Sequence, residues 1–340
     1  MPAPVPRRNR KVYFVGAGVS TALGLPNTPS LIDAVVEFSK AKQWLQSERL
    51  PKRLQAAFRY FYPDAVNQGF KPDVVDFFSS LRTYLDIGAG LVGGFKDAAN
   101  LDRSLRFAIA HLLIDRMHNA EPRMEAGHSF VDQIVQPGII AITSNWDLLL
   151  ERYAAMKGVP LRLSGTGRGN FVVLKLHGSV DWCLGRERDR TYPRTDFANL
   201  RELLFAPHQH RIGLPVHLDE TPIRVRALEA PNQAWRLIRS RAEDLHMVTM
   251  AHGKAPQLGP LRDVWRDAYA ALSRAREMVI VGYSMPPDDI EIRTLLRSGA
   301  IRGGRPPRIE VRNPAPDVHD RLRKYLAREV VSDYTPVPAT

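Results

Sequence analysis

The chain has 340 residues, of which 44% are hydrophobic and 25% are charged, so it can bury a substantial core and falls in the ordinary globular class. Lys and Arg outnumber Asp and Glu by 48 to 36, and the formal net charge of +12 indicates either a surface for nucleic acid or an acidic partner, or a solvated basic face. The single cysteine, Cys183, excludes an internal disulfide and any zinc site built from several cysteines.

The N-terminal residues show no signal-peptide pattern, because Pro- and Arg-rich sequence over residues 1–10 leads directly into the first predicted strand. No apolar span elsewhere is long enough to cross a membrane. We therefore expect a cytoplasmic protein without membrane association.

Five short apolar runs, rich in β-branched residues, predict buried parallel strands. They cover residues 12–16, 139–143, 171–176, 278–282 and 309–313. Each run ends on, or leads directly to, a Gly, Asn, His or Ser. In an open α/β sheet the ligand lies outside the carboxyl ends of the strands, so these residues predict a site there.

The first loop of this kind is Gly16-Ala-Gly-Val-Ser-Thr-Ala-Leu-Gly-Leu-Pro26, between the first strand and a predicted helix. Glycines in such a loop let the backbone approach a pyrophosphate, and the following helix N-terminus favours its negative charge. The third glycine of the common dinucleotide fingerprint is Thr21 here. A tight glycine turn without a ligand is the alternative.

About 115 residues separate the first two strands, which is too long for a loop in a compact domain. Apolar side chains recur at helical spacing from Leu54 and again from Leu105. We therefore expect an inserted helical module over residues 40–135, with a glycine-rich connection at residues 88–94.

From residue 139 onward, strand and helix patterns alternate as in a doubly wound parallel sheet with crossover helices. Helices are expected over about 261–275, from about 288, and up to about 327. The whole of residues 1–340 is thus interpreted as a single α/β domain with a Rossmann-like sheet.

Two regions fit this alternation poorly. Residues 183–245 are rich in Arg, Pro and His, and contain only short strand-like runs such as 222–226. Residues 332–340 are polar and contain proline, so we expect a flexible tail there.

Taken together and in order, several segments resemble the sirtuin family. They are Gly16-Ala-Gly-Val-Ser20 with Gly24-Leu-Pro26, Thr143-Ser-Asn-Trp-Asp147, Leu176-His-Gly178, Val281-Gly-Tyr-Ser284 and the strand that ends in Asn313. About fifty residues, spread over nearly 300, carry the resemblance.

The resemblance implies a contact with NAD+ for each of these segments. The pyrophosphate would be held by Gly16, Ala17, Gly18 and Ser20, and the nicotinamide carboxamide and its ribose would contact Asn145 and Asp147. A phosphate and the adenosine ribose would contact Gly282 and Ser284, and the adenosine side would contact Asn313. The general base would be His177. A turn or helix cap at Asn145 and a structural histidine at His177 are the alternatives.

Cleavage of the nicotinamide–ribose bond suits these residue types. Nicotinamide leaves as a neutral molecule and needs no proton donor, so the site must orient the dinucleotide and help a nucleophile. A histidine accepts a proton from a ribose hydroxyl or water near neutral pH, and an asparagine holds that group without becoming charged.

Departures from the family pattern are equally informative. The two cysteine pairs that bind structural zinc in deacylating sirtuins are absent, so no zinc or other metal is expected. Asn27-Thr-Pro29 replaces the common Asp-Phe-Arg, Tyr283 replaces a frequent Thr, and no acyl-lysine cleft is recognisable. Water is therefore the expected acceptor.

This combination resembles the zinc-free bacterial sirtuin-like proteins of antiphage defence, which hydrolyse NAD+ and deplete it in the infected cell. The resemblance implies an NAD+ hydrolase that works beside a partner, for which we prefer a HerA-type ATPase over a short Argonaute. Because an uncontrolled NAD+ hydrolase would be toxic to its own cell, we also expect a homo-oligomer that a partner or an infection signal activates.

Other functions stay open. A protein deacylase or ADP-ribosyltransferase would use the same NAD+ cleavage with another acceptor. A nucleic-acid-binding or nuclease subunit would use the basic clusters at residues 7–11, 302–308 and 321–328. A metal site at His208, His210 and His217 lacks an acidic complement. Trp146 and Trp182, beside the motifs, fit packing better than stacking on a ligand.

Overall fold

The structure is a computed structural model. It describes residues 11–41, 49–87, 95, 97–125, 127–165, 169–184, 223–225, 245–301 and 306–338.

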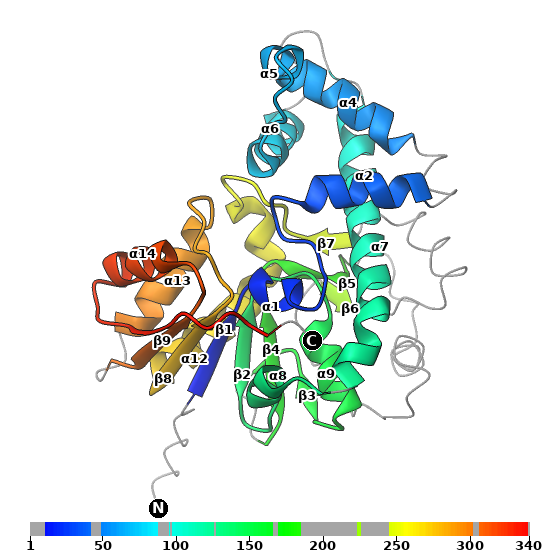
Figure 1. Ribbon diagram of the computed structural model, residues 1–340. Helices are drawn as coiled ribbons and strands as arrows, with labels where there is room; N and C mark the ends of the chain where they lie inside the picture. The colour runs from blue at the N-terminus through cyan, green and yellow to red at the C-terminus, as the bar shows by residue number, and fades with distance from the viewer. Residues whose placement is uncertain are drawn as a thin grey trace, which may run out of the picture.

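The centre of the molecule is a seven-stranded parallel sheet in the order β10-β9-β8-β1-β2-β4-β3 (Figure 1). Its strands are β1 (Lys11–Val15), β2 (Ile140–Thr143), β3 (Leu161–Arg162), β4 (Phe171–Lys175), β8 (Glu277–Val281), β9 (Arg308–Arg312) and β10 (Val331–Asp333). The chain builds outward from β1 in one direction through β2 and β4, and in the other through β8, β9 and β10. The order therefore reverses between β1 and β8, which is the switch point where open α/β sheets bind ligands.

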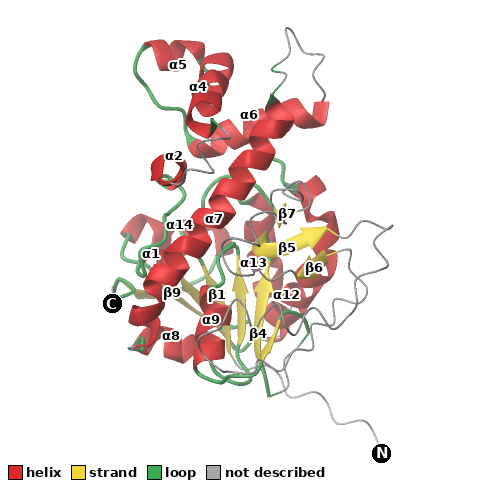
Figure 2. Ribbon diagram, turned by 90° about the vertical axis from the view of Figure 1, so that its right-hand side faces the viewer, coloured by secondary structure: helices red, strands yellow, loops and turns green. Residues whose placement is uncertain are grey.

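The strands are buried because helices cover both faces of the sheet. All described positions of β2 and β4 are buried, as are the last four of β1 and β8. In Figure 2 the sheet lies between α7, α8 and α9 on one side and α12 and α13 on the other. This burial explains why the strands appear in the sequence as continuous apolar runs. The predicted strands at 12–16, 139–143, 171–176, 278–282 and 309–313 correspond to β1, β2, β4, β8 and β9.

The described residues between β1 and β2 form helices and their connections. The helices are α1 (Ala17–Thr21), α2 (Leu31–Ala41), α4 (Leu50–Phe61), α5 (Pro63–Asn67), α6 (Val74–Ile87), α7 (Ala98–Glu125) and α8 (Ser129–Ile134). In Figure 1, α2, α4, α5 and α6 stand above the carboxyl edge of the sheet, and the long helix α7 runs from this group down beside the sheet. On α4 the side chains of Leu50, Leu54 and Ala57 share one face and are buried.

The remaining helices follow the strands as the alternation predicts. They are α9 (Leu149–Met156), the 3-10 helix η2 (Ala255–Leu261), α12 (Arg262–Arg274), α13 (Ile290–Ile301) and α14 (Pro316–Leu326). Glycine at position 299 lets α13 approach α12, because a Cβ atom there would lie 2.4 Å from Leu272 Cβ. None of the described helices combines the length and the apolar composition that a membrane-spanning segment requires.

A second, three-stranded antiparallel sheet has the order β6-β5-β7. Its strands are β5 (Gly178–Leu184), β6 (Ile223–Val225) and β7 (Leu245–Met247). The strand-like run predicted at 222–226 contains β6. Most of the difficult region 183–245 lies outside the described residues.

The C-terminal residues differ from the expected flexible tail over 332–340. Val331–Asp333 form β10, which pairs with β9 in parallel register. The amide of Asn313 donates to the carbonyl of Asp333 at 3.0 Å, and His128 Nε2 lies 2.9 Å from the carbonyl oxygen of Pro338. β10 thus satisfies backbone groups at an otherwise open sheet edge.

Candidate functional site

The loops that follow β1 and β8 are in direct backbone contact at the switch point. The amide of Gly16 donates to the carbonyl of Val281 at 2.9 Å, and the amide of Gly18 donates to the carbonyl of Gly282 at 2.8 Å. A Cβ atom at Gly16 would lie 2.5 Å from the Gly282 carbonyl oxygen, and Gly282 has a φ of +60°. Glycine is required here because any side chain would separate the two loops.

This packing bears on the predicted pyrophosphate contacts. The amides of Gly16 and Gly18 are engaged within the protein, and neither these residues nor Gly282 line the cavity beside them. Ala17, in contrast, does line it. The contacts of the three glycines with a phosphate stay a prediction, and the role visible for them is close approach of two loops.

The cavity has a volume of about 480 Å³ and opens at the carboxyl edge of the sheet, beneath the first turn of α6. Six of the ten predicted site residues line it: Ala17, Ser20, Asn145, Asp147, His177 and Ser284. They come from the segments after β1, β2, β4 and β8, which lie far apart in the sequence. The four that do not line it are Gly16, Gly18, Gly282 and Asn313.

The side chain of Asn145 is held in one orientation. Its amide nitrogen donates to the carbonyl of Gly16 and to Ser20 Oγ, both at 3.1 Å. Because a carbonyl oxygen only accepts, the atom that faces Gly16 must be the nitrogen. The amide oxygen of Asn145 has no hydrogen-bond partner within the described part of the chain. That oxygen is available to accept a hydrogen bond from a ligand.

Both carboxylate oxygens of Asp147 are engaged. One accepts from Ser20 Oγ at 2.7 Å, and the other accepts at 3.0 Å from the first backbone amide of α9. The Asp147 carbonyl accepts from the fully buried Lys175, whose Nζ lies 3.0 Å from Glu151 Oε1. The helix-start role considered for Asn145 thus belongs to Asp147.

His177 follows β4 and lies on the cavity wall. Its side chain is only 6% exposed, and Nε2 is buried without a hydrogen-bond partner among the described residues. Burial, assisted by the positive charge of Lys254, lowers the pKa of His177 to about 3. The imidazole is therefore neutral near pH 7 and is able to accept a proton or a hydrogen bond.

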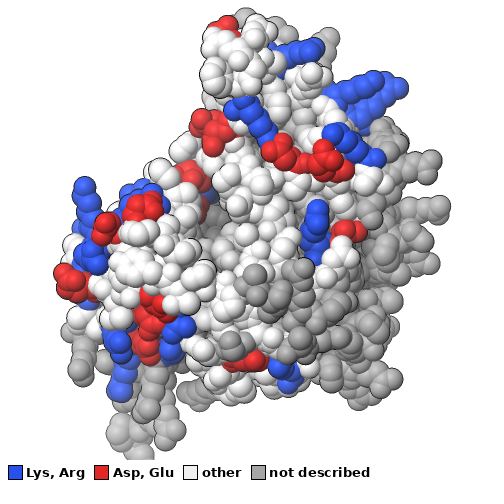
Figure 3. Space-filling view, viewed as in Figure 1, with Lys and Arg blue, Asp and Glu red and all other residues white. Residues whose placement is uncertain are grey.

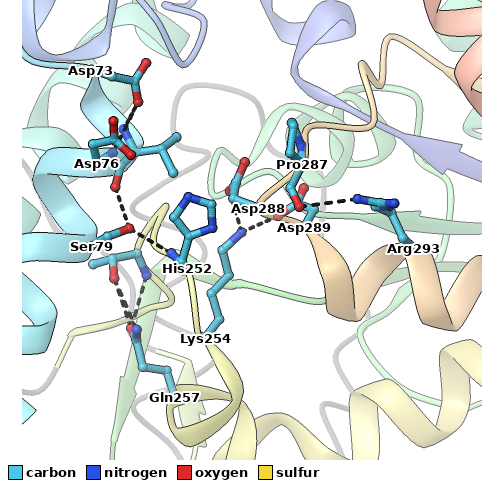
Figure 4. A network of polar contacts seen from close by, with 12 residues as sticks. Asp73, Asp76, Ser79, His252, Lys254, Gln257, Pro287, Asp288, Asp289 and Arg293 are labelled. Atoms are coloured by element: carbon cyan, nitrogen blue, oxygen red, sulfur yellow. Dashed lines mark hydrogen bonds and ion pairs between the residues drawn. The ribbon is translucent and has the colours of Figure 1, made fainter.

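An ion cluster that the motifs do not include completes this wall. Lys254 is 1% exposed, and its Nζ lies 3.0 Å from Asp288 Oδ2 and also contacts Asp289 Oδ1 (Figure 4). Tyr283 donates its hydroxyl to Asp289 Oδ2 at 3.2 Å. Burial alone would lower the pKa of Lys254, but the two carboxylates outweigh it and raise that pKa. Lys254 is therefore charged across the physiological range.

The outer side of the cavity is formed by the start of α6. Asp73 and Asp76 line it, and Asp73 Oδ1 accepts from the amides of residues 75 and 76 at 2.8 and 3.2 Å. Ser79, one turn further along, accepts from the amide of His252 at 2.8 Å (Figure 4). This bond ties the helical module to the loop that carries Lys254.

Asn313 and Ser284 lie at the carboxyl ends of β9 and β8. Asn313 Oδ1 accepts from the amide of Ala315 at 2.9 Å, and its Nδ2 donates to the carbonyl of Tyr283 at 3.4 Å. Ser284 is exposed, and its carbonyl accepts from Arg321 at 3.0 Å. Asn313 therefore braces the loop that presents Ser284 to the cavity.

The basic cluster on α14 is paired largely within its own helix. On α14, Arg321 and Arg323 pair with Asp317 and Asp320 of the same helix at 3.0 and 2.8 Å. Figure 3 shows acidic and basic side chains interleaved on this face rather than a continuous basic surface. Residues 7–10 and 302–305 lie outside the described residues.

The sequence also offered a histidine cluster and two tryptophans as candidates. His208, His210 and His217 lie outside the described residues, and within the described ranges no group of three or more His, Cys, Asp or Glu has the arrangement of a metal site. Trp182 is fully buried and Trp146 is 6% exposed. Trp146 nevertheless lines the cavity.

Comparison with known proteins gives no assignment: no family model matches the chain, and no curated protein matches it. Function must therefore be inferred from the cavity and its residues.

Proposed function

We propose that the protein is an NAD+ hydrolase that releases nicotinamide and ADP-ribose. The observation that carries this proposal is the convergence of Ser20, Asn145, Asp147, His177 and Ser284 on one cavity at the switch point of the sheet. These residues belong to the segments on which the resemblance to sirtuins rests. The volume of about 480 Å³ lies within the usual range for small-molecule and cofactor sites.

The free oxygen of Asn145 gives this site its first chemical role. It is held toward the cavity because the amide nitrogen is bound to Gly16 and Ser20. An acceptor fixed in this way orients a water molecule or a ribose hydroxyl without acquiring charge.

His177 has the complementary role of proton acceptor. In the reaction the bond between C1′ and the pyridine nitrogen breaks, and its electron pair leaves with neutral nicotinamide. Water forms the new bond to C1′ and loses one proton, which His177 takes up and passes to solvent. A pKa of about 3 makes His177 a weak base, so proton transfer must follow the development of positive charge on the ribose.

The electrostatics of the cavity agree with this order of events. Asp73, Asp76, Asp147, Asp288 and Asp289 line it, and Lys254 is the one Lys or Arg among the described residues that line it. An excess of negative charge stabilises a pyridinium ring and the cationic ribose that forms when the ring leaves.

The cellular role rests on the resemblance rather than on the cavity. By resemblance, we infer antiphage defence by NAD+ depletion and control by a HerA-type ATPase. We infer a homo-oligomer because an uncontrolled NAD+ hydrolase would be toxic to its own cell and closed symmetric assembly is the usual form of a homo-oligomer. Zinc is not required, because the residues present do not supply a thiolate set.

The test measures nicotinamide release from NAD+ by chromatography, using the protein together with whatever copurifies from its host. Asn145→Ala and His177→Ala should each lower turnover by roughly 100-fold or more, as expected for loss of a general base or a preorganised hydrogen-bonding group. Ser298→Ala, on α13, is the matched control, because Ser298 does not line the cavity. Unchanged turnover in both variants would remove these residues from the mechanism.

The same assay separates hydrolysis from transfer. Turnover that requires an added acylated peptide or target protein would favour the deacylase or ADP-ribosyltransferase alternative. Turnover in water alone supports the hydrolase.

A further inference from the structure

The two aspartates that hold Lys254 are not equivalent. Asp289 uses both carboxylate oxygens, since Oδ1 contacts Lys254 and Oδ2 accepts from Tyr283 at 3.2 Å. Asp288 uses only Oδ2, which lies 3.0 Å from Lys254 Nζ. Its Oδ1 has no partner in the described part of the chain. Asp288 is therefore a carboxylate that is held in place by Lys254 and has one oxygen left to bind a ligand.

The position of Asp288 indicates where that ligand lies. Its side chain is 8% exposed, and the residue lines the same cavity as Asn145 and His177. His177 Nε2, on the same cavity wall, is also buried without a partner among the described residues. Asp288 is close enough to His177 to oppose the effect of Lys254 on its pKa. The free oxygen of Asp288 and the imidazole of His177 thus border one part of the cavity.

The charge balance gives a physical reason for this arrangement. One ammonium between two carboxylates leaves a net charge of about −1 in a wall that is shielded from water. A buried ion pair is seldom more stabilising than packed apolar side chains of similar volume. A residual negative charge is, however, useful beside a centre that becomes positive during the reaction.

We propose that Asp288 is a substrate-contacting carboxylate whose free oxygen stabilises the cationic ribose while Lys254 and Asp289 hold it in place. This inference rests on the proposed NAD+ hydrolysis. As the C1′–N bond breaks and the electron pair leaves with nicotinamide, Asp288 accepts a hydrogen bond from a ribose hydroxyl and faces the positive charge. Asp288 forms no covalent bond and releases no proton. Water supplies the new C1′–O bond and its proton passes to His177.

The main experiment compares Asp288→Asn with the parent protein, again with its copurifying partners present. The substitution keeps the shape of the side chain and removes its charge. We expect the maximal turnover to fall by roughly 100-fold, with KM and the melting temperature close to those of the parent. Glu291→Gln is the matched control: the same change at the first turn of α13, at a residue that does not line the cavity. It should retain the parent turnover.

Asp289→Asn is the comparison variant, because we expect a structural role only for Asp289. It weakens the Tyr283 and Lys254 contacts, so we expect its main effect on the melting temperature and a smaller effect on turnover. If Asp288→Asn and Asp289→Asn lowered the melting temperature alike and left turnover within three-fold of the parent, the proposal would be overturned.

Chemical rescue adds a readout that packing alone would not change. Asp288→Ala leaves space beside the Lys254 ammonium that formate can enter. Formate, but not chloride, should raise the turnover of this variant at least ten-fold. A folded Asp288→Ala protein that formate does not reactivate would contradict the proposal.

The outcomes also separate this proposal from the hydrolase itself. A parent protein that turns over NAD+, combined with an equally active Asp288→Asn, contradicts only the role of Asp288. A parent that neither binds NAD+ nor releases nicotinamide in the presence of its partners contradicts both.

Discussion

Ser20 donates its hydroxyl hydrogen to Asp147 at 2.7 Å, across 127 residues of sequence. The same hydroxyl oxygen accepts from Asn145 Nδ2 at 3.1 Å. Ser20 thus links the loop after β1 to the loop after β2. Ser20, whose hydroxyl is bound to both residues, therefore sets the direction in which the Asn145 oxygen points.

Substitution Ser20→Ala should therefore lower NAD+ turnover without removing any group that reacts. It leaves the Asn145 amide with one contact instead of two and leaves one Asp147 oxygen without its donor. We expect a loss of roughly 10- to 100-fold in kcat with a modest effect on KM, because the orientation of Asn145 is relaxed. Ser298→Ala, measured by the same nicotinamide assay, should behave as the parent, because Ser298 does not line the cavity. Equal activity of the two variants would show that Ser20 does not orient the site.

Glycine is needed at the contact between the loops after β1 and β8. In Gly16→Ala the new methyl group would lie 2.5 Å from the Gly282 carbonyl oxygen and equally close to the Cα atom of Tyr283. Both neighbours are backbone atoms that cannot rotate away. We expect a loss of about 1–3 kcal/mol in the free energy of unfolding, measured in urea. Gly259→Ala, where no atom lies within 4 Å of the added Cβ, should change it by less than about 0.5 kcal/mol.

The central strands could be predicted because burial on both faces leaves a direct mark on the sequence. β1, β2, β4 and β8 consist mainly of buried residues, β9 alternates buried Ile309 and Val311 with charged residues, and each strand is followed by a polar or glycine-rich turn. β3 and β10 could not be predicted, since they have two and three residues and carry no comparable run. Their pairing depends on sheet edges that exist only once the other strands are in place.

The site was predictable only where its residues belong to local motifs. Asn145 and His177 each follow a predicted strand, so their common edge follows from the parallel sheet. Lys254 and Asp288 carry no such signal, because their contact joins residues 34 positions apart through two irregular loops. The glycine loop predicts a phosphate contact for Gly16, but it does not indicate that Gly16 packs against Gly282, which is far away in the sequence.

Removal of residues 331–340 should destabilise the protein. The truncation exposes the edge of β9, removes the acceptor of the Asn313 amide and breaks the contact between His128 and Pro338. With about 1 kcal/mol for each lost hydrogen bond, the free energy of unfolding should fall by roughly 2–4 kcal/mol. Removal of residues 339–340 alone serves as the control. If both truncated proteins unfold at the same urea concentration as the parent, β10 contributes no stability.

Stability should decrease as the pH falls below about 6.5. Burial lowers the pKa of His177 to about 3 and, together with Arg106, that of His246 to about 4. In the unfolded chain both histidines have a pKa near 6.5, so between these values the unfolded state binds more protons than the folded state. Each histidine then contributes a slope of up to about 1.4 kcal/mol per pH unit, and the contribution ends below its folded pKa.

Substitution His246→Leu tests this dependence without altering the cavity. Urea unfolding at pH 7, 6 and 5 should give a shallower loss of stability in the variant than in the parent. Above pH 7.5 the two proteins should show the same slope, because histidine is neutral in both states there. Parallel curves over the whole range would mean that His246 is protonated equally in the folded and unfolded chains.

Lys175 links the core of the sheet to the candidate site. It is fully buried in β4, where its ammonium donates to the Asp147 carbonyl and lies 3.0 Å from Glu151 Oε1. Lys175→Met should lower the free energy of unfolding by about 3–5 kcal/mol, because it removes the charge that compensates a buried carboxylate. Lys71→Met, which removes an exposed ion pair with Asp33, should cost less than about 1 kcal/mol. Similar losses in the two variants would show that the buried ammonium does not compensate Glu151. A large loss confined to Lys175→Met would show that the buried ammonium compensates Glu151 within the core.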